Sequence, residues 1–309
     1  MKKVLVIIFW LFLYNIYGIE IFLYPTNHLA RKGETIGLVV RETEENKVVS
    51  VSLEDSFNYN IYRVDNNIVY SIIGIPHTIA TNFNIVLTLS NTISNNIWYE
   101  LINFNVSYDV LSYAKRKPKD IKDFNIYNDL NFKTNRFRLN TNYTGRISLF
   151  VVPIPGEIGD GYGVNRSRGG TLYGRIHLGI DILRERGAKV YSTSDGVVAI
   201  TSYDRKAGNY VVVDHGYGVA SVYMHLSKIN VRKGQFVDTN TVIGLVGSTG
   251  RSVGPHLHFG ISVNNVYVDP IIFFERDYTV QSIISNGMRI ILSNSTFADT
   301  SNNLNQPSS

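Results

Sequence analysis

Four histidines and one aspartate in the second half of the chain have the types and spacings that metal and proton chemistry requires. His177 and Asp181 lie in a segment, 176–182, in which apolar and polar residues alternate, and His256 and His258 are separated by one residue. On a β-strand such residues share one face. Because the chain has no cysteine, any metal ion must be held by His, Asp or Glu.

The two spacings place different demands on the backbone. On a straight strand, His177 and Asp181 would lie about 13 Å apart, too far to share one zinc ion. The chain must therefore bend near Gly179, or His177 must lie in the loop before the strand. His256 and His258 would lie about 7 Å apart, so one of them can bind a metal while the other acts beside it.

The remaining histidines carry less information individually. His225 lies in an otherwise apolar strand pattern, and alone it would be interpreted as a hydrogen-bonded core residue. His28 and His77 stand alone in the first half and are interpreted as ordinary histidines. No simple structural explanation accounts for five such residues in one region with many glycines. They are His177, Asp181, His225, His256 and His258.

The elements that position these residues are predicted to be strands. Val, Ile, Tyr, Phe and Thr are abundant, which favours a mostly β protein, and 309 residues with 44% hydrophobic content suffice for two domains with cores. In the first half, short β-prone runs are separated by turn residues, as in an Ig-like β-sandwich. These runs are 20–24, 35–41, 47–53, 68–73, 83–89 and 98–106.

Composition divides the rest of the chain. Residues 1–18, with two lysines before an apolar run, predict a signal peptide or an uncleaved membrane anchor. Residues 19–114 form the predicted sandwich, and 115–148 form a basic connector. Because the N-terminal segment predicts export, we interpret this connector as a solvated surface segment and not as a nucleic-acid site; contact with an anionic wall or membrane polymer stays an alternative. Residues 276–309 form an extension whose polar tail is predicted to be disordered.

The order of motifs across residues 149–275 resembles the lysostaphin and LytM type of zinc metallopeptidase. The resemblance rests on His-x-x-x-Asp at 177–181, Tyr-x-His-Leu at 223–226 and Gly-Pro-His-Leu-His-Phe at 254–259. It continues between them in segments 195–198, 208–216, 231–237 and 247–250. The place of His215 matches a strand end in the family pattern, so the resemblance assigns it a structural role. Ser252-Val253 stands where the family typically has Ser-Thr, a departure that touches no ligand.

The resemblance implies an antiparallel β-sheet peptidase domain with a zinc cleft. Position by position, it makes His177, Asp181 and His258 the zinc ligands, with a fourth coordination position left for water. It assigns His225 and His256 to catalysis, one accepting the proton of the attacking water and the other stabilising the oxyanion. Sequence does not decide which imidazole takes which role.

The implied substrate is the peptide part of bacterial peptidoglycan. Glycine bridges and direct cross-links between stem peptides both lie within the family's range. Two other functions stay open at this stage: an inactive scaffold of the same fold that activates another wall hydrolase, and a wall-binding module. Residues 19–148 could also restrain access to the cleft until the protein reaches its site.

Overall fold

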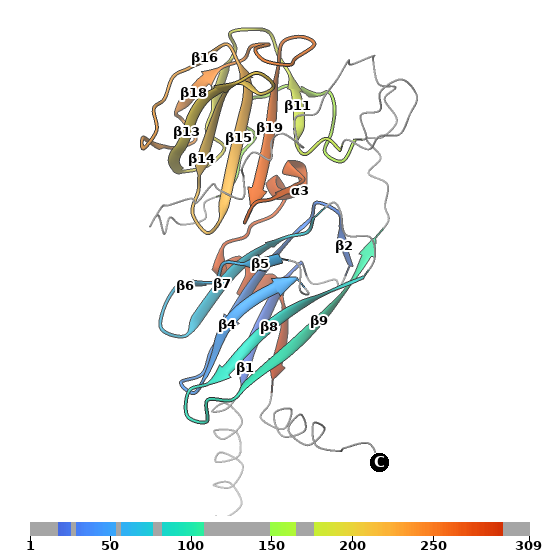
Figure 1. Ribbon diagram of the computed structural model, residues 1–309, viewed down its shortest axis with the longest axis vertical. Coiled ribbons are helices and arrows are strands. Elements are labelled where there is room, and N and C mark those ends of the chain that lie inside the picture. The colour runs from blue at the N-terminus through green and yellow to red at the C-terminus, as the bar shows by residue number, and fades with distance from the viewer. Residues whose placement is uncertain are drawn as a thin grey trace, which may run out of the picture.

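The computed structural model describes residues 18–25, 29–53, 57–76, 82–107, 149–164 and 176–292 (Figure 1). Within these ranges the protein is mostly β, with largely antiparallel sheets, as predicted. One body of strands is built mainly from the first half of the chain, together with the last described strand, and a second body from the second half, with helix α3 (Pro270–Phe274) between them (Figure 1). The Ig-like topology of the first body stays a prediction.

The N-terminal body consists of two five-stranded sheets, ordered β21-β1-β3-β7-β6 and β2-β9-β8-β4-β5. Alternating apolar side chains of both sheets form one shared core, which includes Ile21, Leu38, Val51 and Leu87. All six predicted runs are strands in the structure. The strands are β1 (Ile19–Tyr24), β2 (Leu29–Arg31), β3 (Thr35–Arg41), β4 (Asn46–Leu53), β5 (Phe57–Tyr59), β6 (Tyr62–Arg63), β7 (Ile68–Gly74), β8 (Phe83–Asn91) and β9 (Ile97–Ser107).

The C-terminal body contains an eight-stranded sheet with the order β10-β11-β19-β15-β14-β13-β17, in which β20 also pairs with β19. A three-stranded sheet, β12-β18-β16, accompanies it. The strands are β10 (Glu157–Ile158), β11 (Ile180–Leu183), β12 (Lys189–Tyr191), β13 (Gly196–Asp204), β14 (Gly208–Asp214), β15 (Val219–Leu226), β16 (Lys228–Ile229), β17 (Phe236–Val237), β18 (Val242–Leu245), β19 (His256–Val263) and β20 (Val266–Val268).

The two faces of the large sheet are chemically different. On β19, Leu257, Phe259 and Ile261 point into the main core together with Tyr223 of β15. The opposite face carries His256 and His258 of β19 beside a small apolar cluster from β14 and β15. The strand alternation therefore separates a hydrophobic face from a face that carries His256 and His258.

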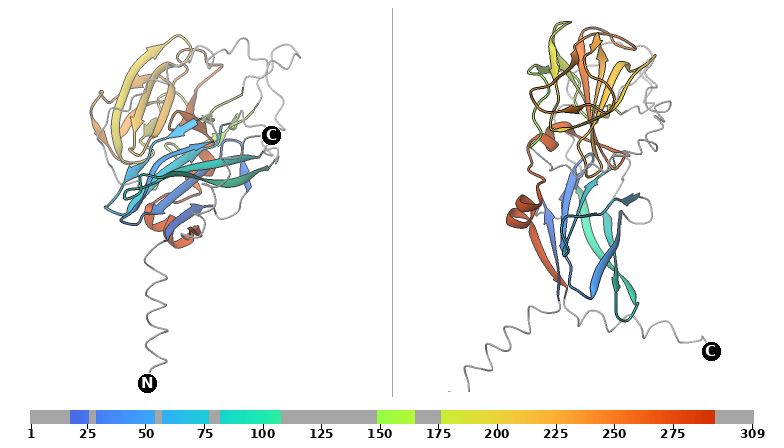
Figure 2. Two further views of the ribbon diagram at one scale, coloured as in Figure 1. Left: turned by 60° about the horizontal axis from the view of Figure 1, so that its bottom comes forward. Right: turned by 90° about the vertical axis from the view of Figure 1, so that its left-hand side faces the viewer.

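The chain returns to the N-terminal body after the large sheet. Helix α4 (Val280–Asn286) leads into strand β21 (Met288–Leu292), which pairs antiparallel with β1 along its length. In Figure 2 the red end of the described chain lies alongside the blue first strand. The predicted extension, 276–309, therefore begins with a segment that completes the first sheet.

Several predictions fall outside the described residues. They concern the signal peptide or anchor over residues 1–17, the basic connector over 115–148, the tail over 293–309, and His28 and His77. Over the ranges that the structure does describe, no helix has the length and apolar character that crossing a membrane requires.

Candidate metal centre

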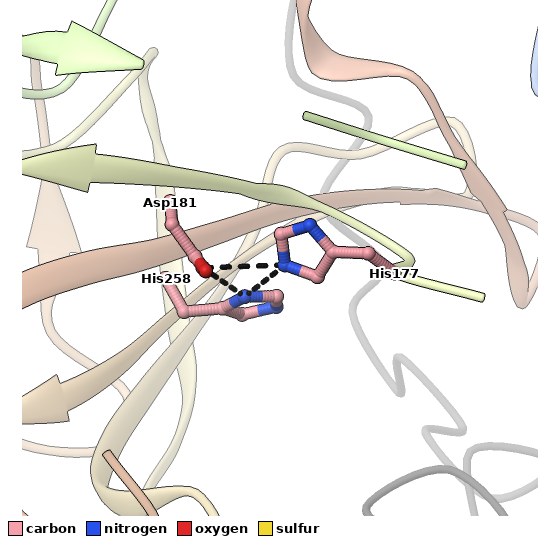
Figure 3. Close-up of side chains that lie close together, drawn as sticks. All are labelled: His177, Asp181 and His258. Atoms are coloured by element: carbon pink, nitrogen blue, oxygen red, sulfur yellow. Dashed lines mark hydrogen bonds and ion pairs between the residues drawn. The ribbon is translucent and has the colours of Figure 1, made fainter. Parts of the chain in front are cut away.

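Three side chains of the C-terminal body converge on one point (Figure 3). The Nε2 atom of His177 lies 2.9 Å from Nδ1 of His258 and 3.2 Å from Oδ1 of Asp181. The Nδ1 atom of His258 lies 2.9 Å from the same carboxylate oxygen. Three donor atoms of the kinds that bind metals thus form a compact triangle in a buried place.

The strands explain how two of these residues meet. β11 and β19 are antiparallel neighbours in which Asp181 lies directly opposite His258. His177 precedes β11, in the second of the two arrangements that the spacing allowed, so its side chain turns back towards the strand. Gly179 makes this approach sterically feasible: a Cβ there would lie 2.4 Å from the Phe259 carbonyl oxygen and 2.9 Å from the His258 ring.

A backbone contact fixes the orientation of His177. Its Nδ1–H donates to the carbonyl oxygen of Gly161 at 2.8 Å, which leaves Nε2 with its lone pair directed at the triangle. Metal-binding histidines usually have such a partner on the other ring nitrogen. The sequence contained no signal for Gly161, because the contact uses a main-chain oxygen that any residue would supply.

His225 reaches this face through a β-bulge. Asn209 pairs with Leu226 and Val211 with Tyr223, so Met224 and His225 together stand opposite a single residue of β14. His225 has a φ of 63°, in the left-handed region. Regular alternation would turn its side chain with Tyr223 into the core, whereas its ring lies 4.9 Å from that of His256 and 6.2 Å from that of His258. The bulge redirects the imidazole to the face that carries His256 and His258.

His225 and His256 present the same nitrogen to the centre. Nδ1–H of His225 donates to the Thr249 carbonyl oxygen at 2.9 Å, and Nδ1–H of His256 donates to that of Gly254 at 2.9 Å. Nε2 of His256 lies 3.8 Å from Oδ1 of Asp181. Burial, followed by the nearby imidazoles of His256 and His258, lowers the pKa of His225 to about 3, so this ring is neutral.

His215 belongs to a different network. Its Nδ1–H donates to the Asp195 carbonyl oxygen at 2.7 Å, and its Nε2 lies 2.7 Å from Oγ of Ser221. The hydroxyl of Ser221 in turn lies 2.8 Å from that of Tyr223 on the core side of the sheet. Burial lowers the pKa of His215 to about 4. These contacts support the structural role that we assigned to it.

The donor set fits a zinc ion. Zinc bonds to His nitrogen and carboxylate oxygen of about 2.0–2.1 Å place tetrahedral ligands about 3.3 Å apart. The three donor atoms are separated by 2.9–3.2 Å, so a small movement outward would fit them to one face of that tetrahedron. Three protein ligands leave one position open, as in catalytic and not structural zinc sites.

A buried His-Asp-His triangle lies on one face of an antiparallel sheet, with two further imidazoles beside it. A site with these features is of the metallopeptidase kind. Residues 175–270 match the profile of Peptidase family M23, so the C-terminal half contains a peptidase family M23 domain. This match confirms the family resemblance drawn from the sequence motifs.

Two relatives are similar to part of this chain. Peptidoglycan DD-endopeptidase ShyB of Vibrio cholerae is 45% identical over 109 residues, which cover 35% of this chain and 26% of that protein. Peptidoglycan DD-endopeptidase ShyA of the same organism is 49% identical over 87 residues, covering 28% and 20%. The matches thus span about a quarter or less of the length of these relatives.

A solved structure resembles more of the molecule. A crystal structure of a Pseudomonas aeruginosa protein assigned to peptidase M23 aligns with a TM-score of 0.54 and 26% identity, covering 79% of this chain and 93% of the other. Because this coverage exceeds the share of the peptidase family M23 match, the likeness includes strands outside residues 175–270.

Proposed function

We propose that this protein is a zinc-dependent endopeptidase that hydrolyses peptide cross-links or bridges of bacterial peptidoglycan. The triangle of His177, Asp181 and His258, flanked by two imidazoles held in one tautomer, is the observation that carries this proposal. Zinc in such a site supplies Lewis-acid chemistry, activating a water molecule and polarising the carbonyl group of the scissile bond.

The remaining groups of the site supply proton transfer and orientation. With Nδ1–H committed to a backbone carbonyl, His225 and His256 each offer Nε2 as the acceptor for a proton of the attacking water. Once protonated, the same nitrogen can donate a hydrogen bond to the oxyanion or deliver the proton to the leaving amine. The bulge at His225 and the neighbouring strand β19 hold the two rings next to each other beside the metal triangle.

The identity of the substrate rests on the relatives. ShyA and ShyB are named peptidoglycan DD-endopeptidases, and they are 49% and 45% identical to this chain over the residues that they match. Of the two bond types that the sequence left open, the DD cross-link between stem peptides is the one their names support. We accordingly place the protein in the periplasm or cell envelope, after export through residues 1–18.

Digestion of purified peptidoglycan, with the released fragments identified by mass, tests this function. The wild-type chain should release uncrosslinked stem peptides, lose this activity in a chelator and regain it with Zn²⁺. His177→Ala should lack both metal and activity. Gly234→Ala is a suitable control, because this turn residue has open space around its Cβ and lies outside the site.

The roles of the two groups of histidines can be separated by metal content. His258→Ala should bind no zinc, whereas His225→Ala and His256→Ala should retain zinc and lose the release of fragments. Zinc-loaded wild-type protein that leaves peptidoglycan intact, but stimulates another wall hydrolase, would overturn the enzyme in favour of the scaffold.

A further inference from the structure

One short loop ahead of the peptidase motifs braces two of the three ligand residues. We call residues 159–164 the brace loop. Besides the Gly161 contact to the His177 ring, it forms main-chain hydrogen bonds on both sides of the ligand segment. They are Gly159 N–H to Asp181 O at 2.8 Å, Asp181 N–H to Asp160 O at 2.9 Å, Gly163 N–H to His177 O at 2.7 Å and His177 N–H to Val164 O at 2.9 Å. The position of the ligands therefore depends on this loop.

The brace loop is held by Tyr162, whose side chain is buried with an exposed fraction of 2%. Its hydroxyl donates to the carbonyl oxygen of Tyr267 at 2.9 Å. Tyr267 lies on β20, the strand that pairs with the ligand-bearing β19. The hydroxyl of Tyr162 is thereby hydrogen-bonded to the peptidase sheet. The preceding residue, Gly161, has the carbonyl oxygen that orients His177.

The ring of Tyr162 lies against the N-terminal body. A Cβ on Gly33 would come within 2.2 Å of its Cε1 atom, so only glycine permits this contact. Gly33 itself has a φ of 80°, and its turn is fixed from both sides, with Gly33 N–H donating to Ile75 O at 2.9 Å and Asp269 N–H donating to Gly33 O at 2.8 Å. An ion pair between Glu34 and Arg276 lies next to this turn.

We propose that Gly33 and Tyr162 are positioning residues for the metal centre, so that the N-terminal body sets the metal affinity of the peptidase half. The turn at Gly33 supports the Tyr162 ring, the ring fixes the brace loop, and the Gly161 carbonyl orients His177. Outer partners of metal-bound histidines typically change metal affinity about 10-fold to 100-fold when they are disturbed. The inference rests on the metal site proposed above and adds a role for the N-terminal body.

Gly33→Ala tests the contact in the full-length chain. Carbon atoms pack at about 3.5–4.0 Å, so the added methyl group must push the ring or the turn by more than about 1 Å. Gly234→Ala is a matched control, because Gly234 has nearly the same φ, 82° against 80°, and nothing within 4 Å of its Cβ. Both variants acquire the same backbone strain, and only Gly33→Ala displaces Tyr162.

Zn²⁺ affinity, measured by competition with a chromophoric chelator, is the main readout, and the visible spectrum of the Co²⁺-substituted protein reports the ligand geometry. Gly33→Ala should bind Zn²⁺ at least about 10-fold more weakly than wild type. Gly234→Ala should match wild type in affinity and spectrum. Equal affinities of Gly33→Ala and Gly234→Ala would overturn the inference.

A double-mutant cycle covers the case in which Gly33→Ala folds poorly. Tyr162→Ala removes the ring and should itself weaken Zn²⁺ binding by a similar factor. Adding Gly33→Ala to Tyr162→Ala should cause no further loss, because the methyl group no longer meets a ring. The inference would be refuted if the two substitutions weakened Zn²⁺ binding independently, so that their factors multiplied in the double mutant. A folded Tyr162→Ala protein with wild-type Zn²⁺ affinity would also refute it. Failure of the wild-type chain to bind Zn²⁺ would instead refute the proposed function.

Discussion

Replacing His215 with glutamine should change how the stability of the protein depends on pH. In the folded protein, burial lowers the pKa of His215 to about 4 from an ordinary value of 6.5. Between these two values the unfolded chain binds a proton that the folded chain excludes. The stabilisation that depends on a neutral His215 is therefore fully present above pH 6.5. It decreases as the pH falls and is lost below about pH 4.

The size of this effect follows from the shift. A difference of about 2.5 pKa units corresponds to about 3 kcal/mol in the free energy of unfolding. A glutamine side chain at this position has no such proton to bind. At pH 7.5 the His215→Gln variant should be less stable than wild type by roughly 1–3 kcal/mol, since the hydrogen bonds to Asp195 and Ser221 are disturbed. At pH 4 the difference between the two proteins should shrink or reverse.

Urea unfolding at pH 7.5, 5.5 and 4.0, with a chelator present so that metal binding does not contribute, measures this difference. Other titrating groups cancel because both proteins contain them. Asp269 is one of these: burial raises its pKa to about 6, so its contribution changes with the opposite sign between pH 3.8 and 6. Parallel stability profiles of wild type and His215→Gln from pH 4 to 7.5 would show that His215 carries no buried neutral imidazole.

Three further changes test other contacts. Gly179→Ala would force a Cβ to within 2.4 Å of the Phe259 carbonyl oxygen, so Zn²⁺ affinity by chelator competition should fall by at least about 10-fold; unchanged affinity would contradict the packing described. Because His225 has a φ of 63°, His225→Asn should be more stable than His225→Ala by about 0.5–1 kcal/mol in urea unfolding, although both are inactive; the reverse order would argue against the bulge. Arg276→Met removes one ion-pair partner of the buried Glu34 carboxylate and should cost about 1.5–3 kcal/mol in the same assay; unchanged stability would show that this ion pair does not stabilise the protein.

The sequence predicted the parts of the site that depend on alternation. His256 and His258 were placed on one face of a strand, and the structure has them there, with Leu257 and Phe259 on the core side. The calculation that His177 and Asp181 could not both lie on one straight strand left two arrangements open, and the observed one, with His177 before the strand, is one of them. Both predictions follow from the two-residue repeat of side-chain direction along a β-strand.

The parts that the sequence did not predict depend on backbone geometry and distant contacts. The redirection of His225 requires a positive φ at a residue that is not glycine, and no pattern of side chains marks it. The brace loop acts through main-chain hydrogen bonds, which are independent of residue type. Strand β21 is short, and its partner β1 lies more than 260 residues earlier, beyond the reach of any local pattern.

The pairing of β21 with β1 has a consequence for how the protein is made. Strand β1 is among the first described segments to be synthesised, yet one of its two neighbours is complete only after residue 292 has been added. Until then, β1 is an open sheet edge that can pair with other chains. The first sheet is therefore completed only after the peptidase half has been synthesised, and a nascent chain stopped before β21 would expose this edge to aggregation.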